Sequence, residues 1–421
     1  MKKNIWFLNH YATPMFYDHG DRHYWFAENL IKKGYSPTIF CASTIHNSDE
    51  KIDTKKELFV RQKTNEIPFV FVKTSEYKGN GLSRVKNMFW FYINSLRIVK
   101  KYANKYGAPD VIVASSGHLL TAVAGLKIAR KLGSLCIVEI RDLWPESIIA
   151  YGFLKEKSVI AKLLYQGEKW IYKRADCLLF TMEGGKDYIK DKKWDKKIDL
   201  EKVHHINNGM DIVQFDSNAR EFKLDDIDLN DEDVFKIVYT GAIRRTNNIG
   251  LLVEAMKYVK EHTDTKVRLI VYGDGNEREQ LEKKCHGEKI ENVIFKGRIE
   301  KKYIPYILTC SDVNILNYTY QEIWKYGGSQ RKLFEYFASG KPVLSTITMG
   351  YDLISSRHAG ISLDSQSARS IGEALIDFSK MEVETRFEMG RNARELAKEY
   401  DFSALTSKLI DVIESIGKRK L

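Results

Sequence analysis

The sequence predicts a two-domain α/β protein built on doubly wound parallel sheets, and three observations support this prediction. With 421 residues and 48.8 kDa, the chain is longer than one hydrophobic core usually organises. Short apolar runs alternate with stretches of helical periodicity, as parallel sheets require, because each crossover needs a connecting helix. The alternation starts at the N-terminus and again near residue 235, which predicts two such sheets.

The first half opens with an apolar run at 3–9, and a long loop containing Pro14 and Gly20 follows. Helical spacing then begins at His23 and is closed by Gly34, a residue type that commonly ends helices. The same order recurs further along this half. Its predicted strands are 3–9, 37–41, 111–114, 135–140, 178–181 and 203–206, and its predicted helices are 23–31 and 119–132.

Residues 225–233 separate the halves with six acidic side chains and few apolar ones. This composition favours a linker or an interdomain surface loop. The α/β order then restarts. The predicted strands are 235–240, 267–272, 293–295 and 312–316, the predicted helices are 251–259, 277–284 and 304–308, and the segment 387–421 is predicted to be helical.

We therefore place the domains at 1–212 and 213–397, and we expect the last helix, 398–421, to pack back on the first domain. Two consecutive units of this build are expected to form a cleft between them. Domain interfaces of this kind are preferred places for small ligands.

Composition limits the compartment and the partners. No apolar run reaches the length of a membrane span and no signal peptide opens the chain, so we expect a cytoplasmic protein. The five cysteines are scattered singly, which favours buried free thiols over a disulfide framework or a zinc site. The net charge of +11 implies an anionic partner: nucleic acid, a phosphorylated substrate or an anionic membrane surface. Nucleic acid is disfavoured, because the basic residues are dispersed and no nucleic-acid-binding module is recognisable.

The stretch 324–343 organises the second half. Gly327 and Gly328 allow a loop to pass where side chains would not fit, and a helix follows until Gly340 and Pro342 stop it. Backbone N–H groups at the start of such a helix can hold a phosphate. Glu335, one turn further in, could accept two hydrogen bonds from a ribose diol. The alternative is that Glu335 lies on the solvated face of an amphipathic helix.

A second phosphate candidate follows the strand 235–240. Gly241, Arg244 and Arg245 come where a strand ends and a helix is about to begin, and two guanidinium groups match a nucleotide diphosphate as it leaves. Two surface arginines in a loop are the alternative. Lys332 could add positive charge or could only extend along the surface.

Two other positions carry weaker signals. Gly273-Asp274-Gly275 matches half of a dinucleotide fingerprint, which is a weak signal for nicotinamide. Gly20 precedes a helix, so its amide could approach an anionic or hydroxyl-rich ligand. A simple turn capped by Asp21 is the alternative.

The charged residues Arg141, Asp142 and Glu146 follow the buried run 135–140. They come at the carboxyl end of a predicted parallel strand, where open α/β sheets place their ligands. An ion pair that holds the turn at Trp144 is the structural alternative.

The segment 82–106 surrounds an aromatic block with basic residues. Such a pattern is typical of an interfacial helix on anionic lipid. A core helix with a basic solvated face is the alternative.

As a set, these motifs resemble the retaining glycosyltransferases of family four, whose GT-B architecture has two facing Rossmann-like domains. The resemblance covers nearly the whole chain. The runs at 141–146 and 332–343 look most similar to a bacterial branch that builds O-antigen and capsule repeat units and includes fucosaminyl transferases. The matching runs are the loop up to Arg22 and residues 141–146, 207–211, 239–241, 273–275, 295–298 and 332–343.

The resemblance implies transfer of a sugar from a nucleotide-diphosphate donor, a UDP-sugar, with retention at the anomeric carbon and without a metal or other cofactor. It implies catalytic roles for Arg141, Asp142, Arg244 and Arg245. The implied donor-binding residues are Gly20, Gly241, Gly273, Arg298, Gly327, Gly328, Ser329, Lys332, Leu333 and Glu335.

The chain departs from the family at three places, and one is that the loop 244–248 has no clear counterpart of the lysine usual in the phosphate loop. Relatives often have a second glutamate upstream of the one that matches Glu335, but the corresponding position here is Gly327. In many relatives a histidine follows the buried strand that here leads into Arg141 and Asp142, so its role near the donor sugar is expected to pass to one of these two residues.

We expect a hexosyl- or N-acetylhexosaminyl-type transferase, peripheral on the inner face of the cell membrane, that acts on a lipid-linked saccharide acceptor and closes its two domains around the donor. One alternative is a non-hydrolysing nucleotide-sugar epimerase. The other is a non-catalytic scaffold that binds a glycan or a nucleotide, which the missing upstream glutamate would favour.

Overall fold

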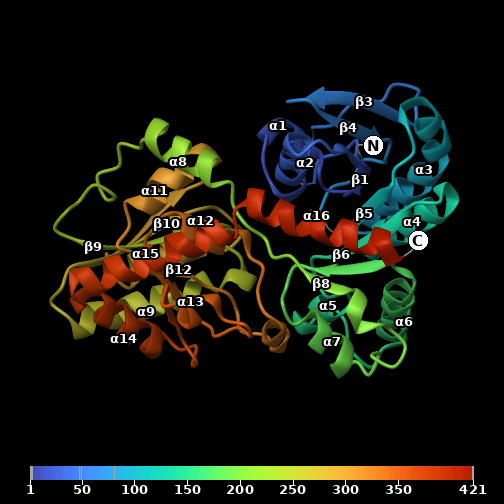
Figure 1. Ribbon diagram of the computed structural model, residues 1–421. Helices are drawn as coiled ribbons and strands as arrows, with labels where there is room; N and C mark the ends of the chain where they lie inside the picture. The colour runs from blue at the N-terminus through green and yellow to red at the C-terminus, as the bar shows by residue number, and fades with distance from the viewer. Residues whose placement is uncertain (1–2, 47, 49, 80, 420–421) are drawn as a thin grey trace. The chain divides into compact units, whose positions relative to one another are not determined.

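The computed structural model describes residues 3–46, 48, 50–79 and 81–419, and the chain divides into two compact units (Figure 1). Unit 1 comprises Met1–Asn207 and Phe402–Leu421, and unit 2 comprises Asn208–Asp401. These bounds differ by a few residues from those we placed from the sequence. Residues 420 and 421 of the predicted last helix lie outside the described residues.

Unit 1 is built on a sheet with eight described strands in the order β3-β4-β2-β1-β5-β6-β7-β8. All neighbours pair in parallel except β3 and β4, which form an antiparallel hairpin at one edge. The strands are β1 (Asn4–Leu8), β2 (Ser36–Ala42), β3 (Phe59–Thr64), β4 (Ile67–Val72), β5 (Val111–Ser115), β6 (Leu135–Ile140), β7 (Cys177–Phe180) and β8 (Val203–His205).

Helices cover both faces of this sheet. The crossover through α2 runs from β1 to β2, whereas those through α3, α4 and α6 run the opposite way across the sheet. Because such crossovers are right-handed, α2 lies on one face and α3, α4 and α6 on the other. The helices are α1 (Thr13–Asp18), α2 (Arg22–Lys32), α3 (Leu82–Tyr106), α4 (Leu119–Leu132), α5 (Glu146–Ala150), α6 (Val159–Arg174), α7 (Gly185–Asp191) and α16 (Phe402–Arg419).

The last helix, α16, packs on α2 (Figure 1). Its first residue, Phe402, lies against the rings of Trp25 and Phe26, with centroid distances of 4.8 and 5.1 Å. The return of the chain to unit 1 therefore rests on aromatic packing. No helix of the described chain combines the length and apolar character that crossing a bilayer requires.

Unit 2 is a parallel sheet with six described strands in the order β11-β10-β9-β12-β13-β14. Its strands are β9 (Phe235–Thr240), β10 (Val267–Tyr272), β11 (Val293–Gly297), β12 (Val313–Leu316), β13 (Val343–Ser345) and β14 (Gly360–Ser362). Its helices are α8 (Ile212–Glu221), α9 (Ile249–His262), α10 (Arg278–Gly287), α11 (Ile304–Thr309), α12 (Arg331–Ala338), α13 (Leu353–Ser356), α14 (Ala368–Lys380) and α15 (Val383–Glu399). The core between the sheet and the packed pair α9 and α14 is aliphatic, with Ile237, Val271 and Leu375 almost fully buried.

Three local expectations need correction. The first loop contains a short helix, α1, because Pro14 occupies a position in its first turn that proline favours. The β3–β4 hairpin was not expected at all. The helical segment 387–421 is interrupted at Tyr400–Asp401 and forms parts of two helices, α15 and α16.

The acidic segment 225–233 belongs to unit 2 and is not a free surface linker. Asp226 is buried and accepts hydrogen bonds from Tyr272 Oη at 2.7 Å and Lys296 Nζ at 2.6 Å. Burial raises the pKa of Asp226, but the hydrogen bonds from these two donors lower it by more. The pKa of Asp226 therefore lies below its ordinary value. Lys296 also reaches Asp228 at 2.7 Å. The segment is therefore hydrogen-bonded to β10 and ion-paired to β11.

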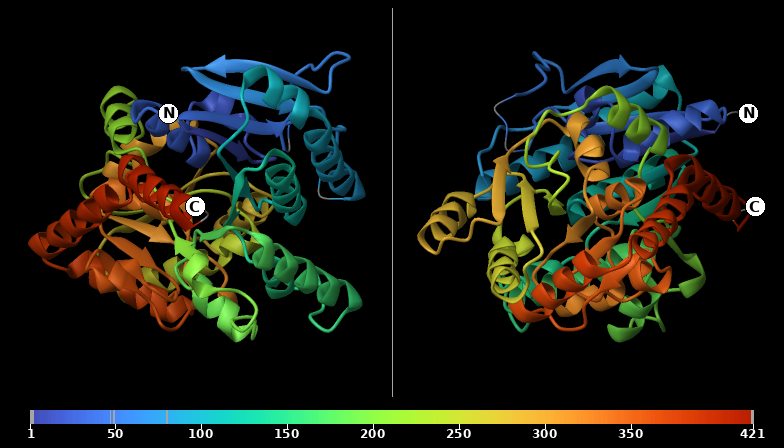
Figure 2. Two further views of the ribbon diagram at one scale, coloured as in Figure 1. Left: turned by 45° about the vertical axis from the view of Figure 1, so that its right-hand side comes forward. Right: turned by 90° about the vertical axis from the view of Figure 1, so that its left-hand side faces the viewer.

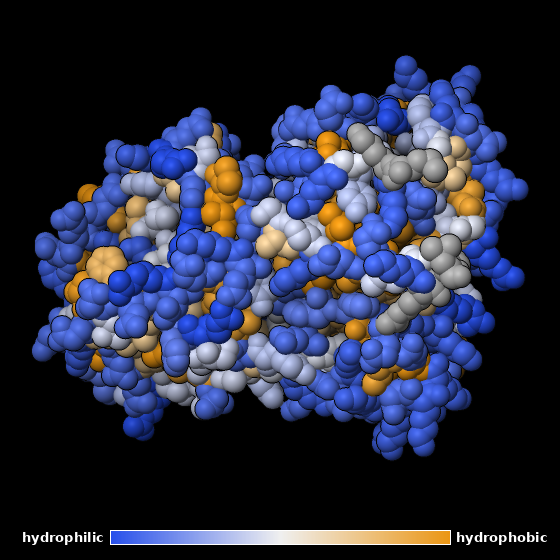
Figure 3. Space-filling model, viewed as in Figure 1, coloured by the Kyte–Doolittle hydropathy of each residue, from blue (hydrophilic) through white to orange (hydrophobic). Residues whose placement is uncertain are grey.

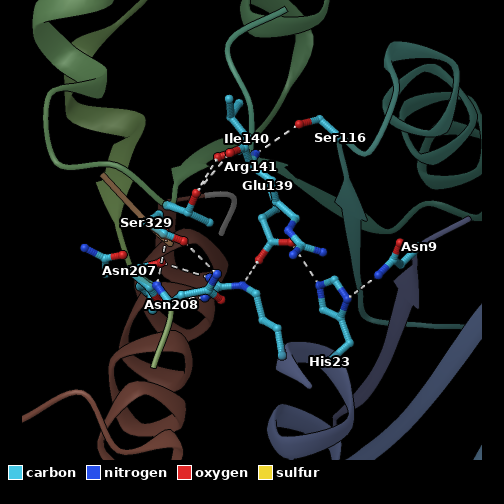
Figure 4. Close-up of polar contacts among 12 residues, drawn as sticks. Asn9, His23, Ser116, Glu139, Ile140, Arg141, Asn207, Asn208 and Ser329 are labelled. Carbon is cyan, nitrogen blue, oxygen red and sulfur yellow. Dashed lines mark hydrogen bonds and ion pairs between the residues drawn. The ribbon is translucent and has the colours of Figure 1, made fainter. Parts of the chain in front are cut away.

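A buried ion pair lies at the centre of unit 1 (Figure 4). Arg22 Nε is 2.7 Å from one oxygen of Glu139, and His23 Nε2 is 2.9 Å from the other. The guanidinium also donates to the carbonyls of Ile206 and Asn207 at 2.9 and 2.6 Å. Burial raises the pKa of Glu139, but the charge of Arg22 and the hydrogen bond with His23 outweigh burial and hold this pKa well below its ordinary value. This network joins α2, β6 and the end of β8.

Replacing Arg22 by Met should lower the free energy of unfolding by about 3–5 kcal/mol, because the Glu139 carboxylate would stay buried without its main partner. Denaturant titration of wild type and R22M measures this. In the double variant R22M/E139L the uncompensated charge is removed as well, so the loss should be smaller. An equal loss in both variants would contradict the charge argument.

Candidate functional site

In unit 2 the carboxyl ends of β9 and β10 meet backbone against backbone. A Cβ atom on Gly273 would lie 1.8 Å from the carbonyl oxygen of Gly241, and one on Gly275 would lie 2.1 Å from that of Ile243. Gly241 itself has a φ of 142°, a conformation that L residues rarely adopt. Glycine is therefore required at this edge by the approach of the two chains.

The loop after β9 presents two arginines. The side chains of Arg244 and Arg245 are exposed, while their loop is fixed from the β12 side. Asn317 Nδ2 donates to the carbonyl of Asn247 at 2.7 Å, and Thr319 Oγ1 donates to that of Arg245 at 2.9 Å. The backbone is held and the guanidinium groups are available to solvent. Arg298, which follows β11, is exposed in the same way.

Lys332 on α12 lies at this glycine-lined edge. Its Nζ donates to Tyr239 Oη at 3.1 Å and lies 4.5 and 4.4 Å from the ring centroids of Tyr239 and Tyr318. The same Nζ is 3.4 Å from the place where a Cβ of Gly241 would be. Burial lowers the pKa of Lys332 to about 7, although Glu335 raises it. The contacts show an ammonium group held by aromatic rings instead of merely extending along the surface.

Glu335, one turn along α12, pairs with Arg331. The distance from Arg331 Nε to Glu335 Oε1 is 3.1 Å, and the glutamate side chain is 18% exposed. Glu335 is therefore a half-buried carboxylate one turn into the helix, with one oxygen bound by Arg331. This contact agrees with the solvated-face alternative and leaves the ribose interpretation a prediction.

The loop before α12 is fixed within unit 2. Gly327 has a φ of 93°, and Ser329 is bound twice by Asn208, whose N–H is 3.2 Å from Ser329 Oγ and whose Nδ2 is 3.0 Å from Ser329 O (Figure 4). Leu333 is buried and its N–H donates to the carbonyl of Gln330 at 3.1 Å. Leu333 therefore contributes to the core of unit 2.

The predicted residues of unit 1 lie elsewhere in the fold. Arg141 and Asp142 follow β6, and the Arg141 N–H donates to Ser116 Oγ at 3.1 Å. Glu146 pairs with Lys192 at 2.5 Å and accepts from Tyr165 Oη at 2.6 Å. Glu146 is thus held by α6 and α7, not by an ion pair with Arg141.

Gly20 precedes α2 in a capped turn. Asp21 is the N-cap of the helix, and its Oδ1 accepts the Arg22 N–H at 2.7 Å. Gly20 packs beside the Trp25 ring, which a Cβ would meet at 3.4 Å. The structure shows the capped-turn alternative for this region, and a ligand contact by Gly20 stays a prediction.

His10 and His118 both follow strands and were interpreted from the sequence as structural residues, but their pairing at the carboxyl ends of β1 and β5 was not predicted. His10 Nε2 is 2.6 Å from Asn87 Oδ1, and His10 Nδ1 is 2.7 Å from His118 Nε2. An amide oxygen only accepts, so His10 Nε2 donates to it and His10 Nδ1 accepts from His118. Burial lowers the pKa of His10 to about 3 and that of His118 well below its ordinary value.

Because the proton of His118 is on Nε2, its Nδ1 is an acceptor. This buried nitrogen has no hydrogen-bond partner among the described residues. The signal available in the sequence was that each histidine follows a predicted strand, since carboxyl ends of parallel strands meet at one edge. No group of three or more His, Cys, Asp or Glu side chains in the described chain is arranged to hold a metal ion.

Both halves of the chain match models of glycosyltransferase families. Residues 24–214 match the model of glycosyltransferase family 4, and residues 221–396 match that of glycosyl transferases group 1. Among curated proteins, the chain is similar to TuaH of Bacillus subtilis, a glycosyltransferase assigned to teichuronic acid biosynthesis, with 27% identity over 213 residues and 50% of each chain covered. It is also similar to WbjE of Pseudomonas aeruginosa, assigned as a glycosyltransferase, with 20% identity over 65% of this chain and 64% of that protein. The chain thus spans about half the length of the first of these relatives.

Solved structures share the fold over nearly the whole chain. Sucrose-phosphate synthase of Thermosynechococcus elongatus superposes with a TM-score of 0.75 at 17% identity, covering 99% of this chain and 100% of that one. Anabaena HepE in complex with UDP superposes with a TM-score of 0.68 at 14% identity, with the same coverage. The shared fold is GT-B, with two Rossmann-like α/β units. The two family models thus match consecutive parts of the chain, and both describe glycosyltransferases.

Proposed function

We propose that this protein transfers a sugar from a UDP-sugar to a lipid-linked saccharide acceptor, with retention at the anomeric carbon, in the synthesis of a cell-surface polysaccharide such as O-antigen or capsule. The protein would act in the cytoplasm at the inner face of the cell membrane. The observation that carries the proposal is Lys332, an ammonium group held between two phenol rings at the glycine-lined strand ends of unit 2.

Lys332 suits a diphosphate because the two side chains in contact with its ammonium group, Tyr239 and Tyr318, are neutral. Its pKa of about 7 shows that burial destabilises the charged form of the side chain. An anionic ligand beside it stabilises the charged form again. The exposed arginines of the loop after β9 would bind the outer phosphate oxygens and stabilise the diphosphate as it leaves. Such a donor site uses ammonium, guanidinium and amide groups in the place of a metal ion.

The nucleotide assignment is supported by a structural relative. HepE, which shares the fold at 14% identity, is described in complex with UDP, and another structure of it contains UDP-glucose. In this chain we assign the ribose to Glu335, which requires that the ribose hydroxyls replace Arg331 on the carboxylate. Arg141 and Asp142 keep their predicted role of orienting the donor sugar.

The acceptor assignment is supported by the assigned role of TuaH in teichuronic acid biosynthesis. Sucrose-phosphate synthase shares the fold as well, so a soluble sugar phosphate is the control acceptor. Purified protein should release UDP from one member of a UDP-sugar panel when membranes carrying lipid-linked saccharides are added, and not with sugar phosphates. Conversion of the donor without any acceptor would indicate an epimerase. Saturable binding without turnover on the whole panel would indicate a non-catalytic scaffold.

Replacing Glu335 by Gln should raise the Kd for UDP at least about tenfold, because hydrogen bonds to a charged acceptor contribute roughly 1.5–3 kcal/mol. Isothermal titration with UDP measures this. Glu279→Gln, an exposed glutamate on α10, is the matched control and should leave the Kd unchanged. Arg331→Gln should not weaken UDP binding. If it weakened binding as much as E335Q, Glu335 would act only through its ion pair.

The double variant R244A/R245A should lower kcat for sugar transfer by at least about 100-fold, since groups that stabilise developing charge act mainly in the transition state. The Kd for UDP should change less than kcat. Arg369→Ala, an exposed arginine of the same unit, serves as the control. A double variant with wild-type kcat would remove these arginines from the mechanism.

UDP binding should weaken as pH rises from 7 to 9, because Lys332, with its pKa near 7, loses its charge in the free protein over this range. The second pKa of a phosphate lies near 6, so the ligand charge is constant there. Lys332→Arg keeps its charge at all these pH values and should show a flat profile. A wild-type Kd that does not change between pH 7 and 9 would contradict this role.

A further inference from the structure

Unit 1 carries a helical layer with a strong positive charge. On one face of its sheet α4 packs against both α3 and α6. The structure describes every residue of these three helices, and none of their Lys and Arg side chains is buried. The thirteen basic residues are Arg84, Lys86, Arg97, Lys100, Lys101, Lys105, Lys127, Arg130, Lys131, Lys162, Lys169, Lys173 and Arg174.

The same three helices have no exposed carboxylate. Glu168 on α6 is their single acidic residue. It is buried, where it accepts hydrogen bonds from Tyr172 and Tyr188 at 2.7 and 2.8 Å. Burial raises the pKa of Glu168 to about 8, so this group is mostly neutral at pH 7. The positive charge of the layer is therefore not balanced within the layer.

The starts of α3 and α6 expose large apolar side chains. Both helices follow parallel strands, β4 and β6, so both begin at the carboxyl-end edge of the sheet. The left view of Figure 2 shows these two starts on the same side of the unit. The exposed apolar residues there, with their exposed fractions, are Leu82 (87%), Val85 (54%), Phe89 (50%), Phe153 (81%), Val159 (72%), Ile160 (61%) and Leu163 (67%).

The face of the molecule drawn in Figure 3 is mainly hydrophilic, with smaller hydrophobic areas. Isolated exposed apolar residues need no explanation, but contiguous patches mark interaction sites. Along α3, the exposed residues change from apolar at Leu82, Val85 and Phe89 to basic at Arg97 and Lys100. Along α6 they change in the same order, from Ile160 and Leu163 to Lys173 and Arg174. Basic side chains also flank the apolar ones at the starts, with Arg84 and Lys86 on α3 and Lys162 on α6, so each helix carries apolar and basic side chains at its start and basic ones toward its end.

We propose that the α3–α6 surface, defined by the seven apolar and thirteen basic residues named above, docks onto a lipid bilayer with anionic headgroups. The apolar residues at the helix starts insert among the acyl chains, and the Lys and Arg side chains bind headgroup phosphates. A nucleic acid would match the charge but would leave the apolar residues in water. The proposal rests on the proposed function and adds to it the surface by which unit 1 reaches a lipid-linked acceptor. The part contributed by α6 and residue 153 was not expected from the sequence.

Vesicle flotation of the full-length protein tests the proposal. Vesicles of phosphatidylcholine with 30 or so per cent phosphatidylglycerol should bind the protein, and pure phosphatidylcholine should bind it much less, with binding weakened by salt. The apolar variant L82S/F153S/I160S should bind at least about tenfold less. The charge variant K86E/K162E/K173E, at three exposed lysines of this surface, should bind at least about 100-fold less, at roughly fivefold for each lysine replaced.

Two matched controls come from exposed positions of unit 2. V383S/F387S on α15 removes apolar side chains that are 56% and 61% exposed, and K260E/K283E/K398E reverses three exposed lysines. Both controls should float like wild type. Equal losses in the control and test variants would overturn the proposal. Thermal unfolding should be unchanged in all four variants, since the positions are on the surface.

UDP titration of the same proteins separates this inference from the proposed function. If wild type floats with anionic vesicles but transfers sugar from no UDP-sugar, the docking surface stands and the proposed function fails. If UDP binds and no flotation occurs, the docking proposal is overturned alone. If short RNA or DNA displaces the protein from vesicles and binds the apolar variant as well as wild type, the surface is one for nucleic acid, which also overturns the proposal.

Discussion

Parallel strand pairing is the constraint on which both units depend. It brings the carboxyl ends of neighbouring strands to one edge, where side chains can converge although they are distant in sequence. In unit 2 this edge holds Gly241, Gly273 and Lys332, with backbones so close that only glycine fits. In unit 1 the same edge holds the histidine pair after β1 and β5 and the starts of α3 and α6. The proposed donor site and the proposed docking surface thus depend on the same geometric property.

Much of the fold could be predicted from the sequence, because apolar periodicity records which face of each element is buried. The parallel strands, and the beginning of a second α/β unit at β9, could be predicted from this periodicity. The β3–β4 hairpin left a weak signal, since β3 is half-exposed and its turn uses Asn65 and Glu66 at positive φ in place of glycine. The acidic segment was misinterpreted because its partners are far away in sequence. Lys296 lies 70 residues from Asp226, and local composition contains no trace of that contact.

The candidate site was predictable at positions where the residue type itself indicates a single structural or chemical role. Glycines at strand ends and arginines in the next loop were named from the sequence, and the structure brings Gly241 and Gly273 into backbone contact. The state of Lys332 was not predictable, because it depends on Tyr239, 93 residues away. Glu139 was passed over as part of an apolar strand. A carboxylate inside such a run was itself a signal that a buried cation must lie opposite it, and that cation is Arg22, 117 residues away.

The contact of Lys332 with two phenol rings has a thermodynamic consequence for any anion that binds beside it. Because the pKa of Lys332 is near 7, its amine is neutral in about half of the free molecules at pH 7. A bound anion stabilises the charged form, so binding draws a proton from the buffer. The heat of binding must then vary with the ionisation enthalpy of that buffer, and the lysine becomes observable in a calorimeter without being changed.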